Sequence, residues 1–231
     1  MGGTIAMKNT SARAIAGFLF IAAALMFWGG WMLLPVHINI YFTPEDILTI
    51  QGDLTMYLWM YRVHIFGMII TIAAMAALGT VFPQISSRVL VNPGLAVIST
   101  GMAVTALGSA FFYQFGTSGA YDLQGMPLEA VREFVASLKL DTQYAGCFMR
   151  FGRVFTGLGM VILGAGLWKS KKLPSWTGIT AIIIGIAAMA VIIVVPTNDL
   201  FYIPVLHLKA LWLAFMGITI LRSQISFPAP Y

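Results

Sequence analysis

The chain alternates between long apolar stretches and shorter polar connections along its whole length. Six stretches reach the roughly 20 apolar residues that a helix needs to cross a hydrocarbon core about 30 Å thick. They cover residues 13–34, 59–81, 94–115, 147–168, 176–196 and 202–221. The pattern therefore predicts an all-α integral membrane protein, a bundle of six transmembrane helices that forms a single domain over residues 1–231.

The composition agrees with a membrane protein. Hydrophobic residues make up 59% of the chain and charged residues 9%, with a mean hydropathy of +0.89. Soluble domains usually carry about 25% charged residues. The single cysteine, Cys147, allows no intrachain disulfide and no thiolate metal cluster. We therefore expect the lipid bilayer as the main surroundings and no nucleic-acid partner.

The charged residues divide between the two sides of the six spans. An even number of spans puts both termini on one side, and the basic residues nearest that side are Lys8, Arg13, Arg88, Lys169, Lys171, Lys172 and Arg222. The eight acidic residues all fall on the other side: Glu45, Asp46, Asp53, Asp122, Glu129, Glu133, Asp141 and Asp199. Because basic residues stay on the cytoplasmic side, this division predicts that both termini are cytoplasmic.

The second outer connection, residues 116–146, contains a short amphipathic pattern. In "MPLEAVREFVASLKL" the apolar residues at 128, 131, 134, 135 and 138 share one helical face, and Pro127 suits a first turn. We expect a short helix here that either lies on the outer leaflet or packs over the mouth of the bundle.

Glycine recurs along the third, fourth and fifth spans. In lipid, helices associate where their backbones approach closely, so small residues mark the contacts. We therefore expect helix contacts at Gly101, Gly108, Gly157, Gly159, Gly164, Gly166, Gly178 and Gly185.

Basic and imidazole side chains gather in the outer half of spans two, four and six. At 1.5 Å per residue, Lys209 lies about 20 Å from the inner boundary and Arg153 about 24 Å from it. Charges inside a membrane cost about 2.5–3.5 kcal/mol each on insertion scales, so they are candidates for a functional site. Nearer the interface, Arg62 and Arg150 can instead extend to lipid headgroups. The full candidate set is His64, His207, Arg62, Arg150, Arg153 and Lys209.

No aspartate or glutamate lies within any predicted span. A proton pump or cation transporter built on membrane carboxylates is therefore disfavoured. The counter-charge for Lys209 and the arginines has to come from an outer connection, where Asp199 could turn inward, or from an anionic ligand. A heme propionate, a lipid phosphate or a small anion would each suit. We expect a basic pocket between spans two, four and six.

Three ligands fit this pocket on chemical grounds. A b-type heme needs two axial ligands, for which His64 and His207 lie at similar depth, with basic residues near the propionates. Copper would suit Met60, His64 and Met68, which are four residues apart and combine thioether with imidazole. A lipid or quinone headgroup could be held by the arginines. The residues alone leave these alternatives open.

An ordered set of motifs runs from Arg150 to Arg222. An arginine-bearing span is followed by "GLWKSKKLPSWTGI", an apolar span, and a last span that contains Trp212 and Gly217 and ends in "LRS". This half of the chain resembles an uncharacterised family of six-helix bacterial inner-membrane proteins, a domain of unknown function. The resemblance implies the fold and a bacterial plasma-membrane location, and it implies no catalytic residues.

The leading functional expectation is a non-catalytic integral membrane subunit or accessory protein of a larger bacterial membrane complex, with other membrane subunits as partners. The connections outside the spans are too small to house an independent active site. One alternative is an electron-transfer membrane protein that binds b-type heme, or copper, with His64 and His207 as the heme ligands. A small-molecule or anion transporter is a third, although the missing membrane carboxylates and the unbroken spans count against it, since transporters commonly use interrupted helices.

Overall fold

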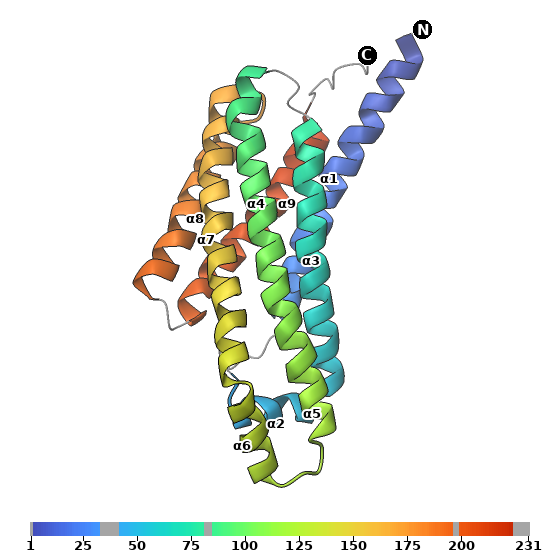
Figure 1. Cartoon of the computed structure of the whole chain (residues 1–231). Helices are drawn as coiled ribbons and strands as arrows, with labels where there is room; N and C mark the ends of the chain where they lie inside the picture. Colours follow the sequence, from blue (N-terminus) through green and yellow to red (C-terminus); the bar gives the residue numbers. More distant parts are fainter. Residues whose placement is uncertain (1, 33–41, 81–84, 196–198, 224–231) are drawn as a thin grey trace.

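Long helices with short connecting helices make up the computed structural model of the protein (Figure 1). The structure describes residues 2–32, 42–80, 85–195 and 199–223, and the side chains of 12–30, 42–80, 89–195 and 201–223. The described residues contain no β-strand. Six of the helices are long and apolar enough to cross a membrane, which confirms the predicted all-α, six-helix membrane bundle.

The six long helices correspond one to one to the predicted spans. They are α1 (Gly2–Met32), α3 (Leu54–Thr80), α4 (Ile85–Phe112), α7 (Lys139–Ser170), α8 (Ser175–Val194) and α9 (Ile203–Arg222). Three of them extend well past the predicted bounds, because α1 begins at Gly2, α4 at Ile85 and α7 at Lys139. The helical stretch from Val89 to Asp122 runs through α4, the π-helical η1 (Tyr113–Thr117) and α5 (Ser118–Asp122). Its 34 residues span about 50 Å, which exceeds the thickness of a hydrocarbon core.

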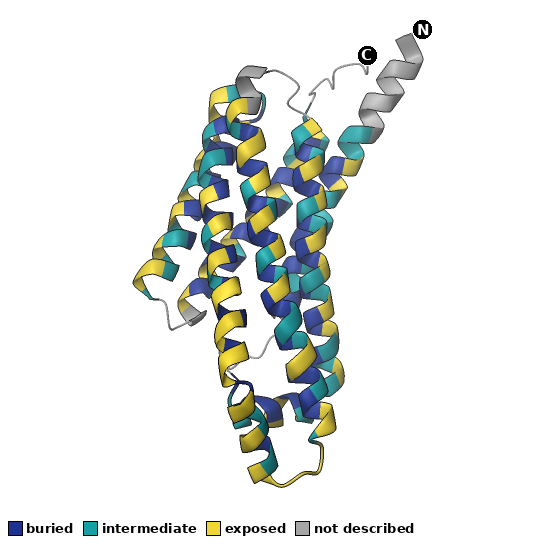
Figure 2. Cartoon of the chain, in the orientation of Figure 1, coloured by how far each residue is buried: buried dark blue, intermediate teal, exposed yellow. Residues whose placement is uncertain are grey.

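The long helices form a closed ring in chain order. Each helix packs against the next, from α1 through α3, α4, α7 and α8 to α9, and α9 packs back against α1. The indole nitrogen of Trp212 on α9 donates a hydrogen bond to the carbonyl of Thr177 on α8, at 3.0 Å. Each inward-facing stripe is therefore buried by helices on both sides, while the outward faces remain exposed (Figure 2).

Glycines spaced seven residues apart bring α7 close to both of its neighbours. A Cβ added to Gly101 on α4 would lie 2.6 Å from the carbonyl oxygen of Gly152 on α7. On the other side of α7, a Cβ added to Gly164 would lie 2.5 Å from the carbonyl oxygen of Gly178 on α8. The expectation that glycines mark the contacts is confirmed. The facing sets are Gly94, Gly101 and Gly108 with Gly152, Gly159 and Gly166, and Gly157 and Gly164 with Gly178 and Gly185.

Short helices cap one end of the ring. This cap consists of α2 (Pro44–Gly52), α5 and α6 (Leu128–Ser137), at the lower end of the bundle in Figure 1. The predicted amphipathic helix is α6. Val131 is buried in an apolar cluster with residues of α2, and Phe134 packs against Gly119 of α5. Pro127 is the N-cap residue rather than part of the first turn, and Leu128 is exposed. The helix thus packs over the mouth of the bundle.

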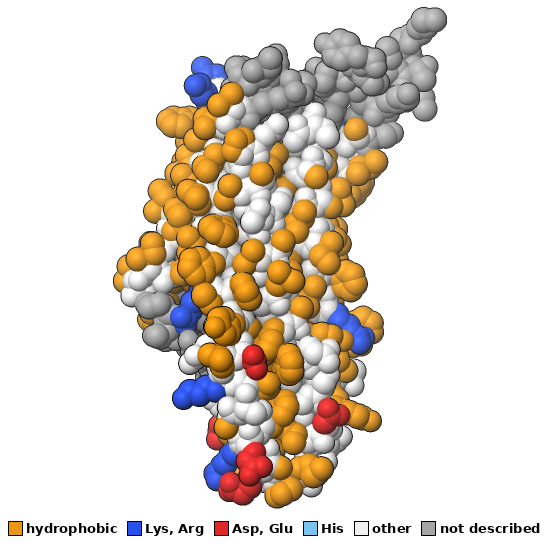
Figure 3. All heavy atoms as spheres, viewed as in Figure 1, with side chains coloured by type: hydrophobic (Ala, Val, Ile, Leu, Met, Phe, Trp, Pro, Cys, Tyr) orange, Lys and Arg blue, Asp and Glu red, His pale blue; other side chains and the backbone are white. Residues whose placement is uncertain are grey.

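The surface of the ring between its two ends is apolar. The acidic side chains visible in Figure 3 lie at the cap end, and a broad belt of hydrophobic side chains covers the long helices. Large exposed residues in this belt include Phe66, Leu107 and Ile183. An apolar surface of this extent is stable in contact with lipid tails rather than water.

We expect Gly101→Ala to destabilise the bundle and Gly29→Ala to leave it unchanged or slightly more stable. The new Cβ at 101 would lie 2.6 Å from the backbone nitrogen of Thr156, and a packed backbone cannot move aside as a side-chain tip can. Overpacking of this kind costs about 1–3 kcal/mol. The Cβ at 29 would meet no atom within 4 Å, and alanine is the better helix former.

Thermal unfolding of both variants in mild detergent measures this difference. Equal unfolding temperatures for the two variants would show that the glycine contacts do not stabilise the ring.

Candidate functional site

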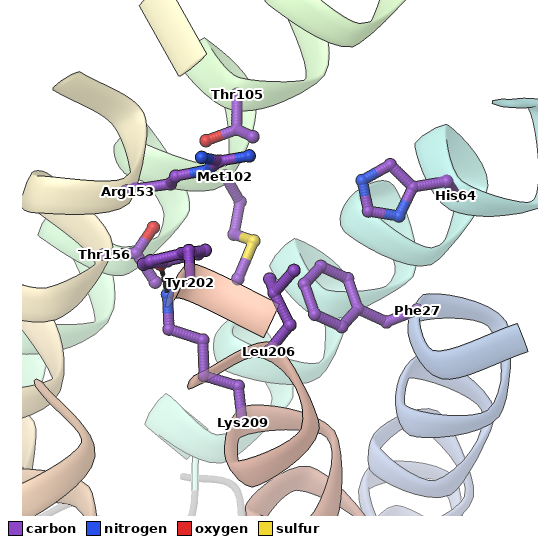
Figure 4. Close-up of a pocket in the computed structure, with 9 residues that line it drawn as sticks. All are labelled: Phe27, His64, Met102, Thr105, Arg153, Thr156, Tyr202, Leu206 and Lys209. Atoms are coloured by element: carbon purple, nitrogen blue, oxygen red, sulfur yellow. Dashed lines mark hydrogen bonds between the residues drawn. The ribbon is translucent and has the colours of Figure 1, made fainter. Parts of the chain in front are cut away.

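Five of the long helices contribute side chains to a small cavity inside the ring. Its volume is about 20 Å³, enough for one or two water molecules. Figure 4 shows the side chains that line it. They are Phe27 from α1, His64 from α3, Met102 and Thr105 from α4, Arg153 and Thr156 from α7, Tyr202 from η2 (Asp199–Tyr202), and Leu206 and Lys209 from α9.

Two cationic side chains in the cavity wall contact the same aromatic ring. The guanidinium carbon of Arg153 lies 4.5 Å from the centroid of the Tyr202 ring. The ammonium nitrogen of Lys209 lies 5.0 Å from that centroid and donates a hydrogen bond to the Tyr202 hydroxyl. All three side chains are buried, with exposed fractions of 3%, 1% and 4% for Arg153, Tyr202 and Lys209. The two cations are therefore no further apart than the sum of their distances to the ring.

The local sequence explains how these groups meet. Tyr202 and Lys209 are seven residues apart, so they lie two helical turns apart on one face of α9 and the turn before it. Pro204 occupies the first turn of α9, where its missing N–H costs no hydrogen bond. Tyr202 itself belongs to the 3-10 turn that leads into this helix. The ring is thus held at the start of α9, over the side chain of Lys209.

Two threonines bring the glycine contacts of α4 and α7 to the cavity. The hydroxyl of Thr105 donates to the carbonyl of Gly101, and the hydroxyl of Thr156 donates to the carbonyl of Gly152, both at 2.8 Å. These hydrogen bonds use the hydroxyl protons, so the oxygens can act only as acceptors toward the cavity. The close contact between α4 and α7 is therefore one wall of the site.

The structure places the two candidate histidines differently. His64 is buried, lines the cavity, and lies with its ring centroid 5.3 Å from that of Phe27. Figure 4 shows it across the cavity from Arg153 and Lys209. His207 is half-buried and does not line this cavity. Its Nδ1 accepts a hydrogen bond of 2.8 Å from the indole nitrogen of Trp28, which joins α9 to α1.

The remaining basic candidates lie outside the cavity. Arg62 is exposed, donates through Nε to the Tyr113 hydroxyl at 3.0 Å, and lies 5.5 Å from the Trp59 ring centroid. Arg150 is half-buried and does not line the cavity. The surroundings of Arg62 are typical of a side chain at a membrane–water interface.

The size of the cavity bears on the heme hypothesis, and the positions of Met60 and Met68 bear on the copper hypothesis. A heme group is many times larger than the cavity, and His207 does not share the cavity with His64. Met60 and Met68 are both fully buried, Met60 in the apolar cluster under the cap and Met68 in the cluster of the ring. Binding of heme or copper stays a prediction.

Sequence reasoning missed Tyr202 and the two threonines. The spacing of seven residues between Tyr202 and Lys209 was a usable signal, because it places a hydrogen-bonding ring above the deepest lysine. Thr105 and Thr156 are each four residues after a contact glycine, Gly101 or Gly152, which would have placed them at the same helix interface. The side chain of Asp199, predicted to turn inward, lies outside the described residues.

No protein-family model matches this sequence, and comparisons with curated proteins and with solved structures give no match. The resemblance of residues 150–222 to a family of six-helix bacterial membrane proteins stays a prediction. The geometry and chemistry of the cavity are therefore the basis for a functional assignment.

We expect Tyr202→Phe to lower the free energy of unfolding by about 1–3 kcal/mol, because Lys209 loses the acceptor of its buried hydrogen bond. The phenyl ring keeps its stacking contact with Arg153. In a Lys209→Met background the same substitution should cost much less, since no buried cation is left without an acceptor.

Unfolding titrations of the wild type, both single variants and the double variant in detergent give the coupling free energy between the two side chains. A coupling indistinguishable from zero would show that the Lys209–Tyr202 hydrogen bond does not contribute to stability.

Proposed function

We propose that the protein is a non-catalytic integral membrane protein that holds an anionic ligand in its basic cavity and acts as an accessory subunit of a larger bacterial membrane complex. The observation that carries this proposal is the burial of Arg153 and Lys209 against one tyrosine ring inside the bundle. The same observation supports the predicted basic pocket between the second, fourth and sixth spans.

Electrostatics favours an anion beside the buried ammonium group of Lys209. Each buried charge loses its hydration, and two like charges within about 10 Å repel by roughly 2 kcal/mol at an effective dielectric constant of 20. None of the described residues that line the cavity is a carboxylate. The acceptor that Lys209 contacts is the neutral hydroxyl of Tyr202. An anion in the cavity would offset part of the cost of burying Lys209.

The size of the site supports a binding role rather than catalysis. A cavity of about 20 Å³ suits an ion or water more than the turnover of an organic substrate. The cap is built from short helices around its own apolar cluster.

The outward face of α7 offers a neighbouring membrane helix an apolar surface. Four exposed aromatic residues form a row on it: Tyr144, Phe148, Phe151 and Phe155.

We place the protein in the bacterial inner membrane with both termini in the cytoplasm, because the lysine cluster lies at the end opposite the acidic cap. In a Cys147→Ser background, a cysteine at Glu129 of α6 should react with a membrane-impermeant maleimide on intact spheroplasts. A cysteine at Lys169 of α7 should react only after the membrane is opened. Both side chains are exposed, so accessibility within the fold is matched. The reverse labelling pattern would overturn the orientation.

The accessory role predicts that the protein migrates with partner subunits. Extracted from native membranes in mild detergent and separated on a native gel, the 25.1 kDa chain should run in a larger assembly. Replacing Phe148 and Phe151 together with alanine should release it, whereas the same change at the exposed pair Ile183 and Ile186 of α8 should not. A wild-type chain that migrates alone would contradict the accessory role.

A further inference from the structure

We propose that Arg62 holds the phosphate group of one membrane phospholipid in the leaflet at the cap end, with the acyl chains of that lipid along the outward face of α3. Arg62 does not line the basic cavity, so this inference is independent of the anion proposed there. A phospholipid combines an anionic phosphodiester with apolar chains, and the surface around Arg62 combines the complementary groups.

The outward face of α3 is apolar except for one arginine. Between residues 59 and 76 its exposed residues recur at helical spacing, and they are Trp59, Arg62, Phe66, Ile69, Ala73 and Ala76. Lipid tails rather than water suit a face of this composition. A charge on such a face is costly unless it reaches a polar group at the membrane surface.

The position of Arg62 along α3 matches the level of a lipid phosphate. From Arg62 to Thr80, the last residue of α3, the helix axis runs about 27 Å. A hydrocarbon core is about 30 Å thick, so α3 brings Arg62 close to the boundary at the cap end when its other end lies at the opposite boundary. The long side chain of an arginine covers the short distance that remains to the headgroups.

Contacts with two aromatic side chains fix the direction of the guanidinium group. Nε of Arg62 donates a hydrogen bond to the Tyr113 hydroxyl at 3.0 Å, and the guanidinium carbon lies 5.7 Å from the centroid of that ring. The same carbon lies 5.5 Å from the centroid of the Trp59 ring. Because the tyrosine engages Nε, the two terminal nitrogens present parallel N–H donors, the arrangement that binds a phosphate through two hydrogen bonds.

Tyr113 reaches Arg62 from a π-helical turn. It is the first residue of η1, which continues α4 toward the cap. Such turns inside longer helices are rare and occur frequently at functional sites. The Tyr113 oxygen accepts from Arg62, so its own hydroxyl proton is a further donor for a phosphate oxygen. Two helical elements therefore supply donors to one point on the lipid-facing surface.

The chain supplies no counter-ion at this point. Within the part of the chain that the structure describes, no carboxylate lies within ion-pair distance of Arg62. Arg132 on α6 is also exposed, but it donates to the carboxylate of Glu129 at 2.8 Å. The anion that a bilayer offers to an exposed arginine at its boundary is the phosphate of a lipid.

Titration of the purified full-length protein with dihexanoyl phosphatidylglycerol, a soluble lipid, measures this binding by native mass spectrometry. We expect one high-affinity site per chain. Arg62→Gln should weaken it about tenfold or more, because charge-assisted hydrogen bonds to the phosphate are lost. Arg132→Gln, the same change at an arginine that has its own carboxylate partner, should leave the affinity unchanged. Tyr113→Phe keeps the ring and should weaken binding by a smaller factor.

Two competitors on the wild-type protein make the test independent of the folding of any variant. Dihexanoyl glycerol has the chains without the phosphate, and glycerol 3-phosphate has the phosphate without the chains, so neither should displace the lipid. Displacement by dihexanoyl glycerol, or equal affinities of the wild type and Arg62→Gln, would overturn the phosphate contact. Displacement by glycerol 3-phosphate at the same concentration as the lipid would overturn the lipid assignment in favour of a soluble phosphate ester.

Discussion

A positive charge inside a membrane bundle needs hydrogen-bond acceptors and a counter-charge, because lipid supplies neither. The arrangement around Tyr202 follows from this constraint. Its hydroxyl accepts a hydrogen bond from Lys209, and its ring faces Arg153. A neutral tyrosine thus gives both buried cations a favourable contact inside the bundle.

The same helix contacts determine the stability of the ring and the size of the cavity. Glycines let α4 and α7 approach until their backbones touch, and Thr105 and Thr156 project into the cavity from that contact. In lipid such close packing replaces the hydrophobic effect as the main source of association. A larger side chain at one of these glycines would therefore both weaken the bundle and alter the volume available to a ligand.

The fold could be predicted from the sequence because spans in lipid need a set length of apolar residues, and six stretches had it. The helix ends were less predictable, since hydropathy reports where a helix is apolar rather than where it stops. The helix predicted over residues 147–168 runs from Lys139 to Ser170. It begins earlier than predicted because its first turns lie at the polar cap end, where hydropathy does not report a helix. The amphipathic helix in the outer connection was identifiable because Val131 and Phe134 repeat at helical spacing.

The candidate site was only partly predictable, because sequence position gives the depth of a side chain but not the neighbour it faces. His207 and Lys209 are two residues apart, which is about 200° around a helix. One therefore contacts Trp28 on α1 while the other enters the cavity. Arg150 and Arg153 likewise share a helix, and Arg153 alone of the two lines the cavity. The inward face of each helix depends on how the helix packs against its neighbours in the ring. The sequence of a single span does not specify that packing.

The most direct test of an anion held beside the buried Lys209 is an X-ray structure of crystals grown in bromide, with the ion located by its anomalous scattering. The account predicts a bromide peak inside the ring, within hydrogen-bonding distance of the ammonium group of Lys209. Bromide peaks confined to the outer surface, with a carboxylate of the chain in contact with Lys209 in the cavity, would contradict it.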